Sequence, residues 1–155
     1  MEELKNILMS GVCRGIVRSV SGDIRRFERR GVADLFSLVT DEPEFLRGAS
    51  VADKVIGRGA ALLLVKGGAR RVYAEVVSSG ALEVLRRADV EVSFGKEVPN
   101  IINRAGTDIC PVEKLTDGVE SPDEAYLMIK EFLTPTPTPL PKGGAVIAFK
   151  GGCKT

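Results

Sequence analysis

The sequence predicts a layered α/β domain, and three observations lead to that class. Strand-like and helical segments alternate in the second half of the chain, as in "RRVYAEVVS", "SGALEVLRRA" and "VEVSF". This alternation is typical of parallel strands joined by right-handed helical crossovers, which place helices on both faces of a sheet. Two β-branched runs joined by "SGD" predict an N-terminal β-hairpin, so the sheet should be mixed. At 155 residues the chain fits a single domain, and we expect a three-layer α/β/α sandwich.

The first half of the chain contains three predicted helices around the hairpin. "EELKNILM" at 2–9 is a short opening helix, and "GVADLFSLV" has apolar residues at helical spacing. A third, buried helix is expected from about Val51 to Val65. Ser50 is a plausible N-cap for it, and Gly67-Gly68 is a strong stop signal.

The second half continues with the strand at 70–78, a helix opened by Ser78 or Ser79, and the strand "VEVSF". A polar loop, "NIINRAGTDICP", then enters a helix near Pro111. "SPDEAYLMIKEFL" is an amphipathic helix with Ser121 at its N-cap. We expect the domain to span residues 1–133. Residues 134–155, which include "TPTPTPLPK", should form an extended, flexible tail.

Composition excludes several classes of function. The net charge is +1 and tryptophan is absent, which argues against nucleic acid as a partner. The chain has neither a membrane-spanning apolar run nor a signal-peptide pattern at its start, so we expect no membrane partner and a cytoplasmic protein. The sequence contains no histidine, and its cysteines, at positions 13, 110 and 153, form no Cys-x-x-Cys pair. Histidine-based triads and closely spaced metal ligands are thereby excluded.

The predicted third helix carries the first candidate site residues. Asp53 and Lys54 lie in its first turns, where they either form a solvated helix start or bind a ligand. In the second case Asp53 accepts a hydrogen bond from the ligand and Lys54 holds an anion. Gly57 and Gly59 indicate close packing against the sheet or close approach of a ligand to the backbone.

Two further groups of candidates follow predicted strands. Ser78 and Ser79 lie between a strand end and a helix start, where they cap the helix or bind a phosphate or ribose. The polar loop contributes four residues, Asn103, Arg104, Thr107 and Cys110. They either bind a ligand or only tie the loop together.

Several of these segments resemble a small prokaryotic family of unknown function that is similar in fold to the cytidine deaminases. The segments "RRGVADLFSLV", "ADKVIGRGAA" and "IINRAGTDICP" carry the resemblance, which covers about residues 2–133. It implies zinc ligands at the fronts of two core helices, near 51–53 and 78–82. Neither place has a histidine or cysteine. We therefore expect a deaminase-like fold without zinc, without another cofactor, and without zinc-dependent deaminase activity.

The function expected from these features is binding of a nucleotide- or nucleoside-like small molecule, with Asp53, Ser78 and the polar loop forming the site. One alternative is a metal-independent enzyme acting on a nucleoside or nucleotide, with Asp53 as base and Lys54 or Arg104 as electrostatic clamp. Another is a structural or assembly protein with a vestigial pocket. A homo-oligomer is compatible with all three.

The tail provides a first testable prediction. Removing residues 135–155 should lower the melting temperature by no more than a few degrees, because a proline-rich terminal segment adds little to a folded core. Thermal unfolding of the full chain and the truncated chain measures this. A larger loss would mean that the apolar run "AVIAF" packs against the domain.

Overall fold

A computed structural model of the chain describes residues 1–29, 31–103 and 105–134. It contains a mixed five-stranded sheet in the order β2-β1-β3-β4-β5. The elements in chain order are α1 (Glu2–Met9), β1 (Gly15–Arg18), β2 (Ile24–Phe27), α2 (Ala33–Asp41), β3 (Ser50–Ile56), α3 (Arg58–Gly67), β4 (Arg71–Ser78), α4 (Ser79–Arg87), β5 (Glu91–Val98), α5 (Pro111–Leu115) and α6 (Pro122–Leu133). The predicted tail from residue 135 onward lies outside the described residues.

Strand direction divides the sheet into two parts. β1 pairs antiparallel with both β2 and β3, whereas β3, β4 and β5 are parallel to one another. The predicted α/β class, the N-terminal hairpin and the mixed sheet are therefore confirmed. β5 extends to Val98, further than the predicted "VEVSF".

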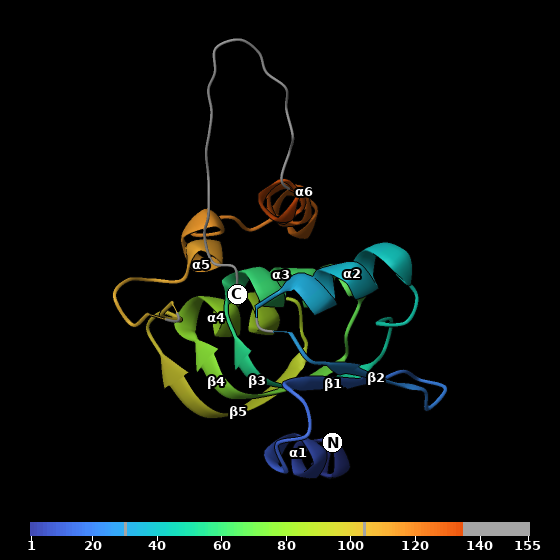
Figure 1. Ribbon diagram of the computed structural model, residues 1–155. Coiled ribbons are helices and arrows are strands. Elements are labelled where there is room, and N and C mark those ends of the chain that lie inside the picture. The colour runs from blue at the N-terminus through green and yellow to red at the C-terminus, as the bar shows by residue number, and fades with distance from the viewer. Residues whose placement is uncertain (30, 104, 135–155) are drawn as a thin grey trace.

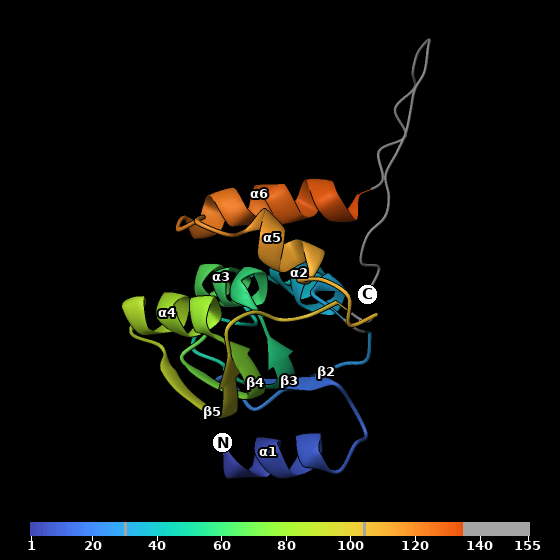
Figure 2. The same ribbon diagram turned by 90° about the vertical axis from the view of Figure 1, so that its left-hand side faces the viewer.

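The helices are distributed unequally over the sheet. α1 covers one face alone, while α2, α3 and α4 cover the other, and α5 and α6 lie over these (Figures 1 and 2). α6 packs on α3 and α2. Within the described part of the chain, no helix is both long and apolar enough to cross a membrane.

The helix predicted over residues 51–65 is wrong in its first half. Residues 50–56 form β3, and the helix α3 begins only at Arg58. Gly57 is the N-cap of α3 and has extended backbone angles, so it marks the change from strand to helix. The apolar content runs without a break from "SVADKVI" into "AALLLV", and this continuity hid the boundary.

β3 is a central strand with both faces covered. Val51 packs in the main core between the sheet and α2, α3, α4 and α6, whereas the adjacent Ala52 packs in a smaller core under α1. Because successive strand residues point to opposite faces, Asp53 shares the face of Val51 and Lys54 that of Ala52. The interpretation of Asp53 and Lys54 as a solvated helix start is therefore wrong.

Gly59 lies in the first turn of α3, where two helices approach closely. A Cβ atom at this position would lie 2.4 Å from Cγ1 of Val112 in α5 and 3.3 Å from Cδ1 of Ile129 in α6. The glycine thus serves close packing, as one of the two sequence interpretations held, although the neighbours are helices and not the sheet.

We expect Gly59→Ala to lower the free energy of unfolding by about 1–3 kcal/mol through overpacking, despite the better helix propensity of alanine. Chemical denaturation measures this. The matched control is the double variant Gly59→Ala, Val112→Ala, in which the smaller side chain makes room for the new methyl group. If the loss in free energy of unfolding of the double variant equals the sum of the losses of Gly59→Ala and Val112→Ala alone, the contact with Val112 does not cause the destabilisation.

Candidate functional site

A pocket of about 440 Å³ opens where the parallel strands end. Ligands of open α/β sheets bind at the carboxyl ends of the strands, and the volume lies in the range of small-molecule sites. We call it the strand-end pocket. It is lined by Arg14, Gly31, Val32, Asp53, Val55, Gly57, Gly59, Ala60, Val76, Val98, Asn100, Ile101, Ile102, Asn103, Cys110, Val112 and Glu113.

Asp53 contributes a carboxyl group to the wall of this pocket from β3. Its partner in the sheet is Gly15 of β1. A Cβ atom at Gly15 would lie 3.1 Å from Cγ of Asp53 and 2.9 Å from Cδ2 of Phe27. The missing side chain at position 15 therefore leaves the space that the Asp53 carboxyl group occupies.

The electrostatic surroundings of Asp53 favour its protonated form. Burial raises the pKa of Asp53 from its ordinary 3.8 to about 7. The backbone N–H groups of Lys54 and Val55 and the charge of Arg14 oppose this shift, while the charge of Asp34 adds to it. Near neutral pH this carboxyl group exists in both protonation states, so it is able to accept or to donate a hydrogen bond.

Glu113 contributes the second carboxyl group, and here the surroundings are different. The side chain is buried, and three segments donate to it: the backbone N–H of Arg58 at 2.7 Å, the backbone N–H of Ile101 at 2.7 Å and the hydroxyl of Ser78 at 3.4 Å. Among the described residues, no Lys or Arg side chain forms an ion pair with it. Glu113 therefore joins α5 to the start of α3 and to the loop after β5.

Arg58 makes a second set of connections at the same place. Its guanidinium group is largely buried and donates to the carbonyl oxygen of Val119 at 2.7 and 3.1 Å and to that of Gly80 at 3.3 Å. Glu83 lies 3.8 Å away and is mostly exposed. The first residue of α3 thus fixes the start of α4 and the segment that leads to α6.

The strand-end pocket brings together three of the residues that the sequence suggested, namely Asp53, Asn103 and Cys110. Asn103 is also bonded within its loop: its Oδ1 accepts from the backbone N–H of Thr107 at 3.1 Å, and its Nδ2 donates to the Thr107 hydroxyl at 3.3 Å. Cys110 directly precedes Pro111, the first residue of α5.

Four other candidates, all among the described residues, do not line this pocket. Lys54 points to the opposite face of the sheet, and Thr107 ties the polar loop to Asn103. Ser78 is buried, and its Oγ accepts from the backbone N–H of Ala81 at 3.1 Å, as expected of an N-cap. Ser79 is exposed and donates to Glu97 at 2.8 Å. Arg104 lies outside the described residues.

Sequence reasoning missed Arg14, Asn100 and Glu113 as lining residues. Arg14 precedes β1 and Asn100 follows β5, so both positions depend on knowing which strands are neighbours. Glu113 has the appearance of an ordinary acid in the first turn of a short helix. The sequence signal that was available is the transition at Gly57, which would have located the end of β3.

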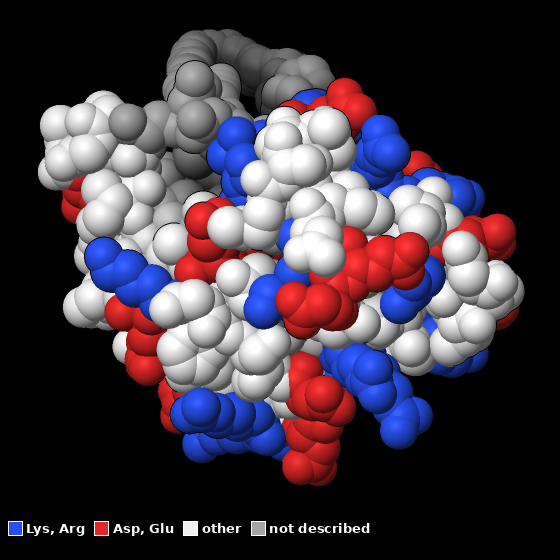
Figure 3. Space-filling model, turned by 90° about the horizontal axis from the view of Figure 1, so that it is seen from below, with Lys and Arg blue, Asp and Glu red and all other residues white. Residues whose placement is uncertain are grey.

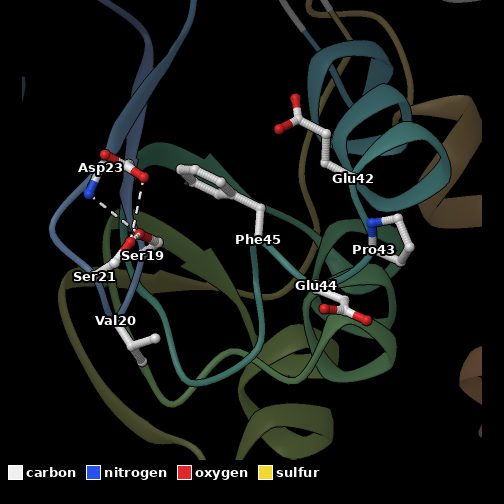
Figure 4. A pocket seen from close by; sticks show the side chains of 8 residues that line it. All are labelled: Ser19, Val20, Ser21, Asp23, Glu42, Pro43, Glu44 and Phe45. Carbon is white, nitrogen blue, oxygen red and sulfur yellow. Dashed lines mark hydrogen bonds between the residues drawn. The ribbon is translucent and has the colours of Figure 1, made fainter.

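A second hollow of about 480 Å³ lies between the β1–β2 turn and the segment after α2. Figure 4 shows its side chains, with Ser19, Ser21 and Asp23 on the turn and Phe45 facing them. The polar groups there form hydrogen bonds with one another: the hydroxyl oxygens of Ser19 and Ser21 are 2.9 Å apart, and the Ser21 hydroxyl donates to Oδ2 of Asp23 at 3.2 Å. Glu42 is paired with Arg25 at 2.7 Å. The strand-end pocket is the better candidate, because the Asp53 carboxyl group there has no such side-chain partner among the described residues.

The fronts of the two core helices do not fit a zinc ion. α3 begins with Arg58 and Gly59 after the N-cap Gly57, and α4 begins with Ser79 and Gly80 after the N-cap Ser78. Neither front supplies the thiolate or imidazole donors that zinc prefers. Within the described part of the chain, no group of three or more His, Cys, Asp or Glu side chains has the spacing of a metal site.

Comparison with known proteins identifies the family. The model of the family described as TM1506, domain of unknown function (DUF1893), matches residues 3–133, so the chain belongs to this family. A crystal structure of a DUF1893 family protein (TM1506) from Thermotoga maritima has the same fold, with a TM-score of 0.77. The two sequences are 22% identical over 85% of this chain and 88% of the other. No curated protein matches the chain.

The raised pKa of Asp53 leads to a prediction about pH. Between its ordinary pKa of 3.8 and about 7, Asp53 is protonated in the folded chain and ionised in the unfolded chain, so its contribution to stability falls as the pH rises through this window. Asp53→Asn removes that loss. The free energy of unfolding of the variant minus that of wild type should therefore increase by about 1–2 kcal/mol when the pH is raised from 5 to 8. Urea denaturation of both proteins at the two pH values measures this; an unchanged difference would contradict it.

Proposed function

We propose that this member of the DUF1893 family binds a nucleoside- or nucleotide-like small molecule in the strand-end pocket. One observation carries the proposal: the half-buried carboxyl group of Asp53, with its pKa raised to about 7, lies in a mostly apolar pocket at the ends of parallel strands. Pockets with apolar walls and a few polar groups of this kind are typical of small-molecule sites.

The chemistry of the wall supports a heterocyclic ligand. Val76, Val98 and Ile101 offer apolar surface to the faces of a ring. The Asp53 carboxyl group and the amides of Asn100 and Asn103 offer donors and acceptors to its edge. A carboxyl group that both donates and accepts matches the adjacent donor and acceptor on the edge of a nucleobase.

The rim of the pocket supports the same proposal. Val55 is 41% exposed and Ile102 is 53% exposed, although both are large apolar residues next to the pocket. A bound ligand would cover part of this apolar surface and gain the corresponding burial energy.

A small molecule is favoured over nucleic acid by the net charge of only +1 and by the mixed charges on one face of the molecule. On the face shown in Figure 3, Lys and Arg side chains lie beside Asp and Glu side chains without separating into one basic area. Binding of a phosphate backbone generally requires such a basic area.

The three-layer α/β/α arrangement and the cytidine deaminase-like classification belong to this proposal as well. The strand order, the unequal covering of the two sheet faces and the start of α3 and α4 at the strand ends support them. In this classification the fronts of α3 and α4 correspond to the two zinc-binding segments of the deaminases. The sequence placed the first of these near residues 51–53. Because α3 begins only at Arg58, the corresponding residues are Gly57–Gly59.

A metal-independent enzyme acting on a nucleoside is the second candidate. The raised pKa of Asp53 favours it, because a general acid or base works best with a pKa near the working pH. Turnover of a bound compound would select the enzyme. A failure of all compounds to bind would favour a structural or assembly protein.

The test begins with a thermal-shift screen of ribonucleosides, their 5′-monophosphates and sugar phosphates. A compound at 100 times its dissociation constant should stabilise the protein by roughly 2.7 kcal/mol. Calorimetric titration then compares variants: Asp53→Ala should weaken binding by about 1–3 kcal/mol, or roughly 5- to 150-fold, because it removes both the donor and the acceptor that would meet the ligand.

The matched control is Lys54→Ala, which alters the next residue of β3 but on the other face of the sheet. It should bind as wild type does. Normal binding by Asp53→Ala, or equal losses in the two variants, would refute the assignment of the ligand to this pocket.

A further inference from the structure

The starts of α3 and α4, the helices that follow β3 and β4 directly, are already occupied by acceptors of the chain itself. At the start of α3, the backbone N–H of Arg58 donates to Oε1 of Glu113 at 2.7 Å. At the start of α4, the backbone N–H of Ala81 donates to Oγ of Ser78 at 3.1 Å, and the Ser78 hydroxyl in turn lies 3.4 Å from Glu113. In many α/β proteins the N–H groups at the corresponding helix starts have no acceptor within the chain and bind the phosphate of a ligand.

Glu113 has the properties of an internal anion that fills this place. It is 6% exposed, and its second oxygen accepts from the backbone N–H of Ile101 at 2.7 Å. Gly57, the N-cap of α3, has no side chain to separate it from this carboxylate, since a Cβ atom there would lie 3.0 Å from Oε1. The positive end of the α3 dipole is therefore compensated from within the chain.

We propose that the strand-end pocket selects an unphosphorylated ligand, a nucleoside or free base, and that Glu113 is the residue that excludes a phosphate from the front of α3. This inference rests on the proposed function and narrows its ligand class. A phosphate at the front of α3 would have to displace the Glu113 carboxylate or lie beside it, and like charges at short range repel strongly. Asp53, when ionised, adds to the same repulsion.

Arg14 is the feature that a phosphate would use if the inference is wrong. It is the single Lys or Arg among the described residues that line the pocket. Its charge acts on the Asp53 carboxyl group, whose pKa it lowers.

Calorimetric titration of the full chain with matched pairs tests the proposal: adenosine against its 5′-monophosphate, and cytidine, guanosine and uridine likewise. We expect the nucleoside of the best pair to bind at least about tenfold more tightly than its monophosphate. A monophosphate that binds as well or more tightly would overturn the inference while leaving the proposed function intact. If no member of any pair binds, the proposed function fails first and this inference with it.

Glu113→Gln identifies the residue responsible. It removes the charge and retains an acceptor oxygen, so the preference for the nucleoside should shrink at least about threefold. Glu83→Gln is the matched control, because Glu83 is also a carboxylate near Arg58 but is mostly exposed and does not line the pocket. Its ratio should remain that of wild type. An unchanged ratio in a folded Glu113→Gln protein would assign the selectivity elsewhere. If the Glu113→Gln protein does not fold, the titrations of wild-type protein with each nucleoside and its monophosphate still decide the inference about the ligand class.

Discussion

The arrangement of the pocket depends on one buried carboxylate. Glu113 accepts hydrogen bonds from Arg58, Ile101 and Ser78, which belong to the start of α3, the loop after β5 and the end of β4. A buried charge without such donors would be strongly unfavourable, so the three segments and the carboxylate require one another. Loss of one donor would leave part of this buried charge uncompensated and would weaken the connection between the short helix α5 and the sheet edge.

The second constraint is the narrow space around α3. Val112 approaches position 59 so closely that a side chain there would clash with it. The preceding residue, Arg58, donates hydrogen bonds to the carbonyl oxygens of Gly80 in α4 and of Val119. Because α5 lies against α3 at this point, Val112 and Glu113 reach the pocket together. The same contact therefore provides packing on one side and a polar connection on the other.

Local signals predicted much of the fold. The caps at Ser78 and Ser121, Pro122 at the start of α6 and the turn between β1 and β2 all act within a few residues, so they can be recognised without knowledge of the tertiary structure. β3 was missed because a central strand covered on both faces is apolar along its length, as a buried helix is. The correct boundary at Gly57 required that glycine to be recognised as a cap.

The site was predicted less completely, and the reason is again geometric. Asp53 was selected as adjacent to Lys54, yet strand geometry places the two side chains on opposite faces of the sheet. Arg14, Asn100 and Glu113 reach the pocket from β1, from the end of β5 and from α5, and their proximity follows from strand order and helix packing. No spacing in the sequence encodes that proximity.

The two carboxyl groups of the pocket are held in opposite ways, and this difference separates structure from function. Glu113 is surrounded by donors of the chain, so its charge is compensated and its geometry is fixed. Asp53 is half-buried, and this burial raises its pKa to about 7, because the N–H groups of Lys54 and Val55 and the charge of Arg14 offset it only in part. A carboxyl group in a pocket that has no side-chain partner among the described residues is available to a ligand. The structural carboxylate therefore shapes the site, and the perturbed one is the group that a bound molecule would meet.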